Sequence, residues 1–216
     1  MIKRIIILSL FMAASFAASA DTIGFVVGAG SWSQDASGDL TSGSVTNSQP
    51  FTKGDSASMV WAVIEHPIPV LPNVRFATTP VDSSNDSGDS LKMDQTDLTL
   101  YYEILDNWVN LDLGLTGRKI DGTIKTSGSS DDFNATIPMV YARAQFDVPI
   151  TGLSIGALVN TIGVFKDVSF YVSYETAIGL GLELGQRKQT IDLDDNNDVT
   201  SSLENSGTYF AAFYHF

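Results

Sequence analysis

Cysteine is absent from this 216-residue sequence, and histidine occurs only twice, at His66 and His215. The lack of cysteine excludes a disulfide framework, a thiolate metal site and a cysteine nucleophile. Positive charge is also scarce, because 12 lysines and arginines stand against 25 aspartates and glutamates. Nucleic-acid binding needs a basic surface, so this balance argues against a nucleic-acid partner.

Long hydrophobic runs are missing beyond the N-terminal segment. Hydrophobic residues make up 44% of the chain, yet they are interleaved with polar residues. A membrane-spanning helix needs roughly 20 consecutive apolar residues, so a membrane protein built of helices is excluded. A barrel of membrane-spanning strands stays possible, because such strands alternate apolar and polar residues.

The N-terminal segment has the parts of a secretory signal. Two positive residues precede an apolar stretch at 5–14, and a small-x-small pattern ends at Ala20. This order predicts that residues 1–20 are cleaved before Asp21, which leaves a single domain at 21–216. An uncleaved N-terminal anchor is the alternative. The mature chain would keep ten lysines and arginines against 25 acidic residues, a net charge of −15.

Apolar and polar residues alternate along most of the remaining chain. Between Val109 and Leu115 every second residue is Val or Leu, and the residues between them are Asn, Asp and Gly. This period is typical of β-strands with one apolar and one polar face. The pattern predicts an all-β fold, a closed antiparallel transmembrane β-barrel of about ten strands. Eight strands are the alternative, if the stretch from Gly152 to Glu175 does not form a full hairpin. The predicted strands are 22–33, 56–65, 73–80, 94–105, 108–120, 134–147, 153–161, 168–176, 179–193 and 203–216.

The connections between these strands fall into two classes that take turns along the chain. Short ones are expected at 66–72, 106–107, 149–152 and near Ala177. Longer polar ones are expected at 34–55, 82–90, 121–133 and 194–202, with a shorter one near 163–167. Outer-membrane barrels have short periplasmic turns and longer extracellular loops. The order therefore predicts a barrel in the outer membrane of a Gram-negative bacterium, with a soluble periplasmic barrel as the alternative.

The last predicted strand ends in an aromatic pattern. Phe210, Ala212, Tyr214 and Phe216 share one face at period 2. This resembles the C-terminal signature of bacterial outer-membrane barrels. The resemblance implies that the barrel-assembly machinery recognises the strand during insertion. Aromatic side chains also suit the girdle at the membrane–water interface.

The mature chain as a whole resembles an uncharacterised family of small Gram-negative outer-membrane β-barrel proteins. The resemblance rests on residues 146–157 (FDVPITGLSIGA), on residues 180–185 (LGLELG) followed by Arg187, and on the closing residues 214–216 (YHF). These are structural motifs. They imply a fold and a location, and no activity.

Ten charged residues fall on the polar faces of the predicted strands. An arginine turned to lipid at mid-bilayer costs about 2–4 kcal/mol, so we expect these faces to line the lumen. Arginine bridges carboxylates through two hydrogen bonds, and a small barrel is just filled by its side chains, so a filled polar lumen is expected. A narrow pore or transporter for small solutes is the alternative. The ten residues are Arg75, Asp97, Glu103, Asp112, Arg118, Arg143, Asp147, Glu175, Glu183 and Arg187.

No catalytic, cofactor or metal site is predicted. Both histidines fall at predicted periplasmic ends, away from a catalytic site at the outer rim. The acidic stretch 192–198 departs from the EF-hand pattern, because Asn197 stands where Gly belongs and Leu203 stands where Glu belongs. We therefore expect a monomeric outer-membrane barrel that is not an enzyme. Its expected role is structural or interactive, through acidic extracellular loops and contacts with outer-membrane lipid and lipopolysaccharide.

Overall fold

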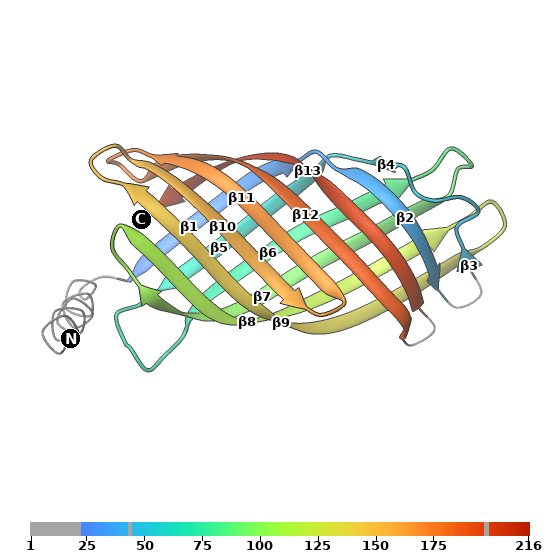
Figure 1. Cartoon of the computed structure of the whole chain (residues 1–216), viewed down its shortest axis with the longest axis horizontal. Helices are drawn as coiled ribbons and strands as arrows, with labels where there is room; N and C mark the ends of the chain where they lie inside the picture. The colour runs from blue at the N-terminus through green and yellow to red at the C-terminus, as the bar shows by residue number, and fades with distance from the viewer. Residues whose placement is uncertain (1–22, 43–44, 197–198) are drawn as a thin grey trace, which may run out of the picture.

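The computed structural model describes residues 23–42, 45–196 and 199–216, which form one antiparallel sheet that closes on itself (Figure 1). The predicted signal segment 1–20 lies outside the described residues, and so does its cleavage site between Ala20 and Asp21.

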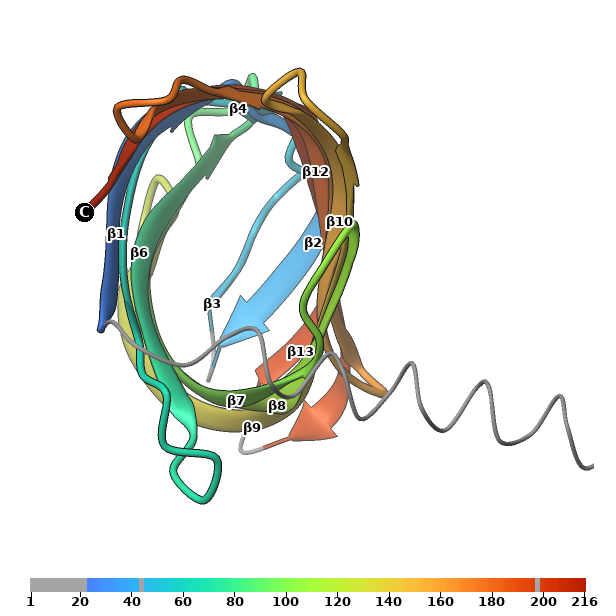
Figure 2. The same cartoon turned by 90° about the vertical axis from the view of Figure 1, so that its left-hand side faces the viewer.

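Ten strands form the closed barrel, as the ten alternating runs predict. β1 closes the ring by pairing with both β5 and β13, and Figure 2 shows the ring end-on. The eight-strand alternative is wrong, because β10 and β11 form a complete hairpin. The strands are β1 (Gly24–Trp32), β5 (Ala57–Glu65), β6 (Asn73–Ser84), β7 (Ser90–Leu105), β8 (Val109–Lys125), β9 (Ser130–Val148), β10 (Leu153–Ile162), β11 (Phe165–Glu175), β12 (Leu180–Asn196) and β13 (Val199–His215).

The two ends of the barrel differ. One end, called the turn end below, carries the connections 66–72, 106–108, 149–152 and 176–179 together with Gly24 and Phe216, and it lies on the left of Figure 1. The opposite end, called the loop end, carries the connections from β6 to β7 and from β8 to β9. The expected short turns therefore all lie at one end.

The connections at the loop end are shorter than the sequence predicts. The expected loops at 82–90 and 121–133 are mostly strand, so that only 85–89 and 126–129 connect their strands. The expected loop at 194–202 is also mostly strand. These segments are almost entirely polar: 82–90 holds no large apolar residue, and 121–133 holds only Ile124 and Phe133. Without a regular apolar face, the sequence pattern of each strand ends before the strand itself does.

The expected loop at 34–55 also contains strands. β2 (Asp35–Ser42) continues the line of β1 along β13, and its end pairs with β3 (Val45–Thr46). β4 (Lys53–Gly54) pairs with β6. The Phe51 N–H donates a hydrogen bond of 2.7 Å to the carbonyl oxygen of Gly38, which joins the segment before β4 to β2. Seen through the ring in Figure 2, β2 and β3 lie across the far opening.

β8 shows how the two faces exchange character. Toward the turn end its outward residues are Val109, Leu113 and Leu115, whereas its inward residues are polar, as at Asp112. Beyond Arg118 the inward residues become Ile120, Gly122 and Ile124, and the outward residues become Lys119, Asp121 and Lys125. The barrel therefore has a turn half that is apolar outside and a loop half that is apolar inside.

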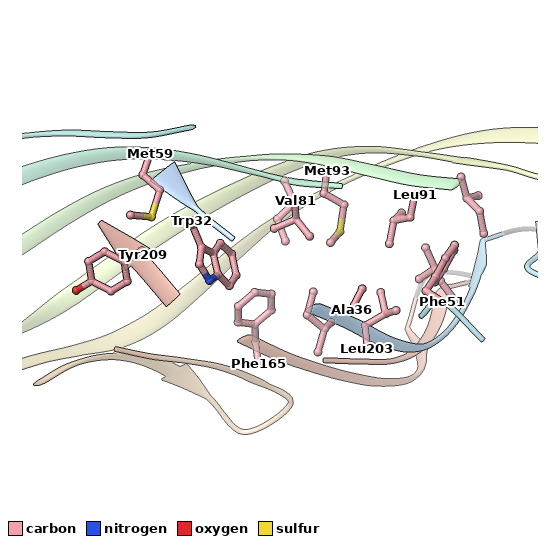
Figure 3. Close-up of a cluster of buried hydrophobic side chains, with 14 of the residues drawn as sticks. Trp32, Ala36, Phe51, Met59, Val81, Leu91, Met93, Phe165, Leu203 and Tyr209 are labelled. Carbon is pink, nitrogen blue, oxygen red and sulfur yellow. The ribbon is translucent and has the colours of Figure 1, made fainter. Parts of the chain in front are cut away.

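The inside of the loop half is a packed hydrophobic core (Figure 3). Trp32, Phe51 and Phe165 are completely buried there. Burying such side chains contributes roughly 1.5–3 kcal/mol each, as in a soluble protein. At its inner end the cluster reaches Met59, Tyr171 and Tyr209, which also line the interior of the turn half. The cluster consists of Trp32, Ala36, Leu40, Val45, Phe51, Met59, Val81, Leu91, Met93, Ile120, Ile124, Met139, Phe165, Tyr171, Ile191, Leu203 and Tyr209.

Candidate functional site

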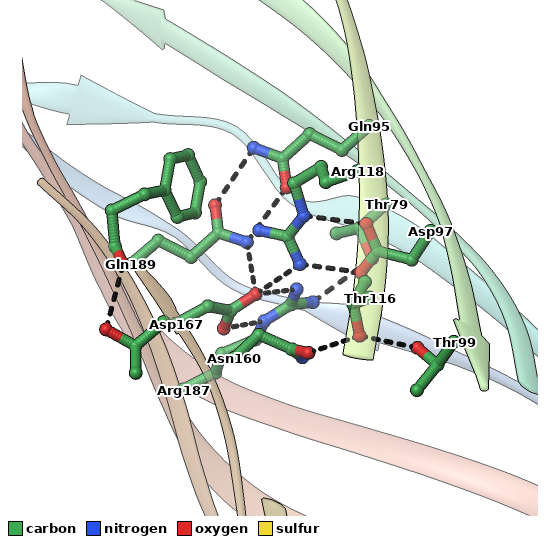
Figure 4. A network of polar contacts seen from close by, with 12 residues as sticks. Thr79, Gln95, Asp97, Thr99, Thr116, Arg118, Asn160, Asp167, Arg187 and Gln189 are labelled. Carbon is green, nitrogen blue, oxygen red and sulfur yellow. Dashed lines mark hydrogen bonds and ion pairs between the residues drawn. The ribbon is translucent and has the colours of Figure 1, made fainter. Parts of the chain in front are cut away.

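A network of charged side chains crosses the interior where the polar half meets the apolar half (Figure 4). The buried Arg118 binds Asp97 through two hydrogen bonds, from Nε at 2.7 Å and from Nη2 at 2.6 Å. Arg118 Nη2 also lies 2.7 Å from Asp167 Oδ2. Arg187 binds the same Asp167 from Nε at 2.9 Å and from Nη2 at 2.7 Å. Each buried charge thus faces an opposite charge, as burial requires.

Two glutamines extend this network across the barrel. Gln95 and Gln189 exchange hydrogen bonds of 3.1 and 2.9 Å, and Gln189 also donates to Asp167 at 2.9 Å. Both glutamines are buried. The network therefore fills the interior at this level with side chains that bind one another.

The strand register explains how the network assembles. Asp97 on β7 is the direct cross-strand partner of Arg118 on β8. Asp167 on β11 is the direct partner of Gln189 on β12. Each hairpin thus presents neighbouring polar side chains inward, and Arg118 joins the two hairpins across the interior.

Aromatic rings of the core cover the network on its loop side. The Arg118 guanidinium lies 5.0 Å from the Phe165 ring centre, and that of Arg187 lies 4.9 Å from the Trp32 ring centre. Both rings belong to the hydrophobic core. Core and network together close the interior between the loop end and the middle of the barrel.

On the other side of the network, the interior holds a cavity of about 1160 Å³ that reaches the turn end. Its wall is rich in tyrosines and carboxylates. Inward-facing glycines make room for the rings: a Cβ added to Gly156 would lie 2.4 Å from the Tyr171 ring, and one added to Gly28 would lie 2.2 Å from that of Trp61.

Arg143 is held in the cavity wall by several partners. Its Nε donates to the Tyr171 hydroxyl at 2.8 Å, and its Nη2 donates to Gln145 Oε1 at 2.6 Å. Its Nη1 lies 3.7 Å from Asp112. Asp147 accepts hydrogen bonds from Asn110, Gln145 and Ser154 close by.

The structure divides the ten charged residues of the predicted lumen into two groups. Asp97, Arg118 and Arg187 form the network. The other seven line the cavity: Arg75, Glu103, Asp112, Arg143, Asp147, Glu175 and Glu183. The expectation of a polar lumen filled along its length needs correction, because the turn half keeps a cavity and the loop half is apolar.

Sequence reasoning missed Gln95, Asp167 and Gln189. Asp167 fell at the edge of an expected connection, although it shares its face with Ser169 and Tyr171 at period 2. That spacing was the available signal. Gln95 and Gln189 lie on inward faces of predicted strands, but the alternation of charged residues does not distinguish these uncharged side chains from other polar ones.

The two basic residue types lie on opposite sides of the wall. Arg75, Arg118, Arg143 and Arg187 all face the interior. Every lysine in the described part of the chain is exposed, and all of them lie in the loop half: Lys53, Lys92, Lys119, Lys125, Lys166 and Lys188.

Both histidines lie at the turn end. His66 Nε2 lies 3.1 Å from the Pro72 carbonyl oxygen, and His215 Nδ1 lies 3.4 Å from Glu175.

Within residues 23–42, 45–196 and 199–216, no group of three His, Asp or Glu side chains could hold a metal ion. No helix in this part of the chain is long and apolar enough to cross a membrane.

The outer surface of the turn half is a continuous apolar belt. Leu115 is 67% exposed and Phe170 is 63% exposed, and many other large apolar side chains around them are exposed as well. The surface of a soluble protein rarely carries an apolar patch of this extent. Further belt residues are Phe25, Val27, Val60, Ile64, Phe76, Leu98, Leu100, Tyr102, Ile104, Val109, Leu113, Val140, Phe146, Ile155, Val172, Tyr174, Leu180, Leu182, Leu184, Phe210 and Tyr214.

Comparison with solved structures finds one outer-membrane barrel with the same fold, the first of the three that follow. The outer membrane protease OmpT from Escherichia coli aligns with 92% of this chain and 99% of its own, at 9% identity and a TM-score of 0.58. Neisserial surface protein A aligns with 91% of this chain and 100% of its own, at 13% identity and a TM-score of 0.41. Ail of Yersinia pestis aligns with 89% of this chain and 98% of its own, at 12% identity and a TM-score of 0.43. No protein-family profile and no curated sequence matches the chain.

The fold is that of an outer-membrane β-barrel. Its apolar belt is the surface that such a barrel turns to lipid, and the chain is therefore located in the outer membrane. In this class of protein the chain turns back close to the belt on the periplasmic side and extends further beyond it on the outside. Here the turns at the turn end lie close to the apolar belt, whereas the hairpins at the loop end and the segment between β1 and β5 extend well beyond it, so the turn end is the periplasmic end. The loop half, polar outside and apolar inside, then stands in water beyond the outer leaflet.

Proposed function

We propose that this protein is a non-conducting outer-membrane barrel that acts through the outer surface of its loop half. The observation that carries the proposal is the closed interior. The Arg118 network and the hydrophobic core around Trp32 and Phe165 leave the periplasmic cavity without an exit to the outside. A narrow pore for solutes would need a continuous polar path, and the apolar core interrupts it.

The lysines of the loop half favour lipopolysaccharide as a contact. On β8, Lys119 follows Leu115 on the outward face by four residues, about 13 Å along the strand. Lys188 stands in the same relation to Leu184 on β12. Each lysine forms an exposed ion pair, Lys119 with Asp121 and Lys188 with Glu204, both at 2.7 Å. These ammonium groups would lie just above the apolar belt, where anionic groups of the outer leaflet would compete with the carboxylates for them. The proposed role is thus an interaction role at the cell surface.

The chain would belong to a family of small Gram-negative outer-membrane barrels and would act as a monomer, without enzymatic activity. The solved protease has the same fold, but both histidines of this chain lie at the opposite end from the surface-exposed loop half. Tyr214 and Phe216 are part of the proposed signal by which the barrel-assembly machinery recognises the last strand. Their rings meet edge to face at 4.6 Å, and Phe216 N–H donates to the Phe25 carbonyl oxygen.

Planar-bilayer recording on the refolded protein tests the closed interior. The native barrel should give no unitary currents. A triple variant, Trp32→Ala, Phe165→Ala and Arg118→Ala, removes the side chains that close the middle of the interior and is expected to admit ions if it stays folded. Reproducible unitary currents from the native protein would show that the interior conducts and would overturn the proposal.

A further inference from the structure

Arg75 differs from the other three inward arginines. Arg118, Arg143 and Arg187 each donate to oxygen acceptors at 2.6–2.9 Å. Arg75 has no hydrogen bond or ion pair with any other described residue, although it interacts electrostatically with Glu183. Its Nη1 is buried without an acceptor, as is Nη1 of Arg118, but Arg118 binds carboxylates through its other nitrogens. The Arg75 guanidinium lies 5.9 Å from the Trp61 ring centre, which gives it a packing partner but no acceptor. A buried donor without a partner costs about 1–3 kcal/mol, so this group can gain from an oxygen ligand.

Tyr141 supplies a second unfilled donor in the same cavity wall. Its side chain is 2% exposed, and its hydroxyl has no hydrogen-bond partner among the described residues. The hydroxyls of Tyr101 and Tyr209, in contrast, donate to Glu65 and Glu183. Tyr141 interacts electrostatically with Arg143 and Arg75, and with one carboxylate, that of Asp112. These positive groups and the free hydroxyl together favour an anionic oxygen group.

The rest of the cavity wall disfavours a simple anion. Nine carboxylates line the cavity against three guanidinium groups. Glu103 repels Glu65, Asp106 and Asp112, and Arg143 attracts it more weakly. Glu103 has no hydrogen bond or ion pair with the residues that the structure describes. Its carboxylate is therefore open to a cation, and an anion that carries no positive group would be repelled.

We propose that the periplasmic cavity binds a small zwitterion, whose carboxylate or phosphate group accepts from Arg75 and Tyr141 and whose ammonium group faces Glu65 and Glu103. The strand register supports this spacing. Val63 on β5 is the cross-strand partner of Arg75, and Glu65 follows it by two residues toward the turn end, about 7 Å. A two-carbon spacer between the charged groups suits that distance. The site is independent of the proposed surface role, because it opens to the other side of the membrane.

Isothermal titration calorimetry on the full barrel, refolded in detergent micelles, tests this site. The probes are β-alanine and phosphoethanolamine, which share a two-carbon spacer and differ in the anionic group. Saturable one-to-one binding is expected for at least one of them, and the tighter probe identifies the anionic group. Ethanolamine and inorganic phosphate, each with half of the charge pattern, should bind at least about tenfold more weakly, a difference of about 1.4 kcal/mol.

Variants locate the two poles of the site. Arg75→Gln and Glu103→Gln should each weaken binding of the zwitterion about tenfold, and Tyr141→Phe should weaken it several-fold while keeping the ring that contacts Tyr101. Lys166→Gln, on the outer surface, should leave the affinity unchanged. The proposal is overturned if neither zwitterion binds, if ethanolamine or phosphate binds as tightly, or if Arg75→Gln and Tyr141→Phe both bind like the native protein.

Discussion

Arginine and lysine carry the same charge, yet this barrel keeps them on opposite sides of its wall. Arginine is less strongly hydrated and offers a planar set of donors that binds two carboxylates at once, as Arg118 does with Asp97 and Asp167. Lysine is a strongly hydrated point charge, and Lys119, the next residue, is exposed to water. The sequence predicts the inward arginines from their place on the polar faces. It does not reveal Asp167 as the shared acceptor, because that contact joins two hairpins far apart in the chain.

At Arg118, replacement by methionine should destabilise the barrel by about 3–5 kcal/mol, because it leaves Asp97 buried without its positive partner. Urea unfolding in lipid vesicles, followed by tryptophan fluorescence, measures this loss. The matched control is Lys119→Met, one residue along and on the water-exposed face, which should stay within about 0.5 kcal/mol. Similar losses for the two variants would contradict the structural role of the network.

Asp89, in the connection between β6 and β7, holds the segment after β3 in place. Its carboxylate accepts from the Ser48 hydroxyl at 2.6 Å and from the Ser48 N–H at 2.6 Å. These hydrogen bonds lower the pKa of Asp89 in the folded protein. A lowered folded-state pKa stabilises the fold above the unfolded-state pKa, and this stabilisation is lost as the pH falls through the folded-state pKa.

The Asp89→Asn variant should therefore have a lower melting temperature than the native protein at pH 7. The difference between the two melting temperatures should disappear as the pH falls below about 4, the ordinary aspartate pKa. Thermal unfolding, followed by circular dichroism at a series of pH values between 7 and 3, measures this difference in melting temperature. Asp86→Asn, which affects only the exposed ion pair with Lys53, serves as the control and should change the melting temperature little. A gap between Asp89→Asn and the native protein that persists unchanged at low pH would exclude this explanation.

Strands in this molecule pass through two different surroundings, and their residue pattern changes on the way. On β7, Leu98 and Leu100 face outward, whereas Leu91 and Met93 face inward. Alternation predicted the turn half of each strand closely, because one face is apolar throughout it. It failed in the loop half, because the apolar residues change faces there and the outermost strand segments, such as 82–84 and 130–132, are polar on both faces. The physical cause is the end of the apolar belt, beyond which water replaces lipid outside.

Leu115 tests the boundary between these surroundings. Leu115→Arg places a charge on the belt and should cost about 2–4 kcal/mol near the bilayer midplane, less near its edge. Thr123→Arg lies outward on the same strand in the loop half and should cost little. The yield of folding into lipid vesicles at increasing urea compares the two. If urea lowers the folding yield of Leu115→Arg and Thr123→Arg equally, the apolar belt does not end between these two positions.

The whole barrel consists of three zones stacked along its axis: a periplasmic cavity, a network of ion pairs and an extracellular hydrophobic core. The sequence predicts the barrel, its strand number and its location. The cavity depends on how far ten strands hold the opposite walls apart and on which side chains reach inward, and a linear pattern does not contain that information. The closed core depends on the segment around Phe51, which is held against the interior by the pairing of β2 with β13 and of β4 with β6, between residues far apart in the chain.

The orientation of these zones across the membrane can be tested because the native chain has no cysteine, so that a single introduced cysteine is the only thiol. Ser127 lies at the exposed tip between β8 and β9 at the loop end, and Ala177 lies in the exposed turn between β11 and β12 at the opposite end. A membrane-impermeant maleimide should label Ser127→Cys on intact cells. It should label Ala177→Cys only after the outer membrane has been permeabilised, because the periplasmic turn is otherwise out of reach. The reverse order of labelling would place the Arg75 cavity at the cell surface and the hydrophobic core in the periplasm.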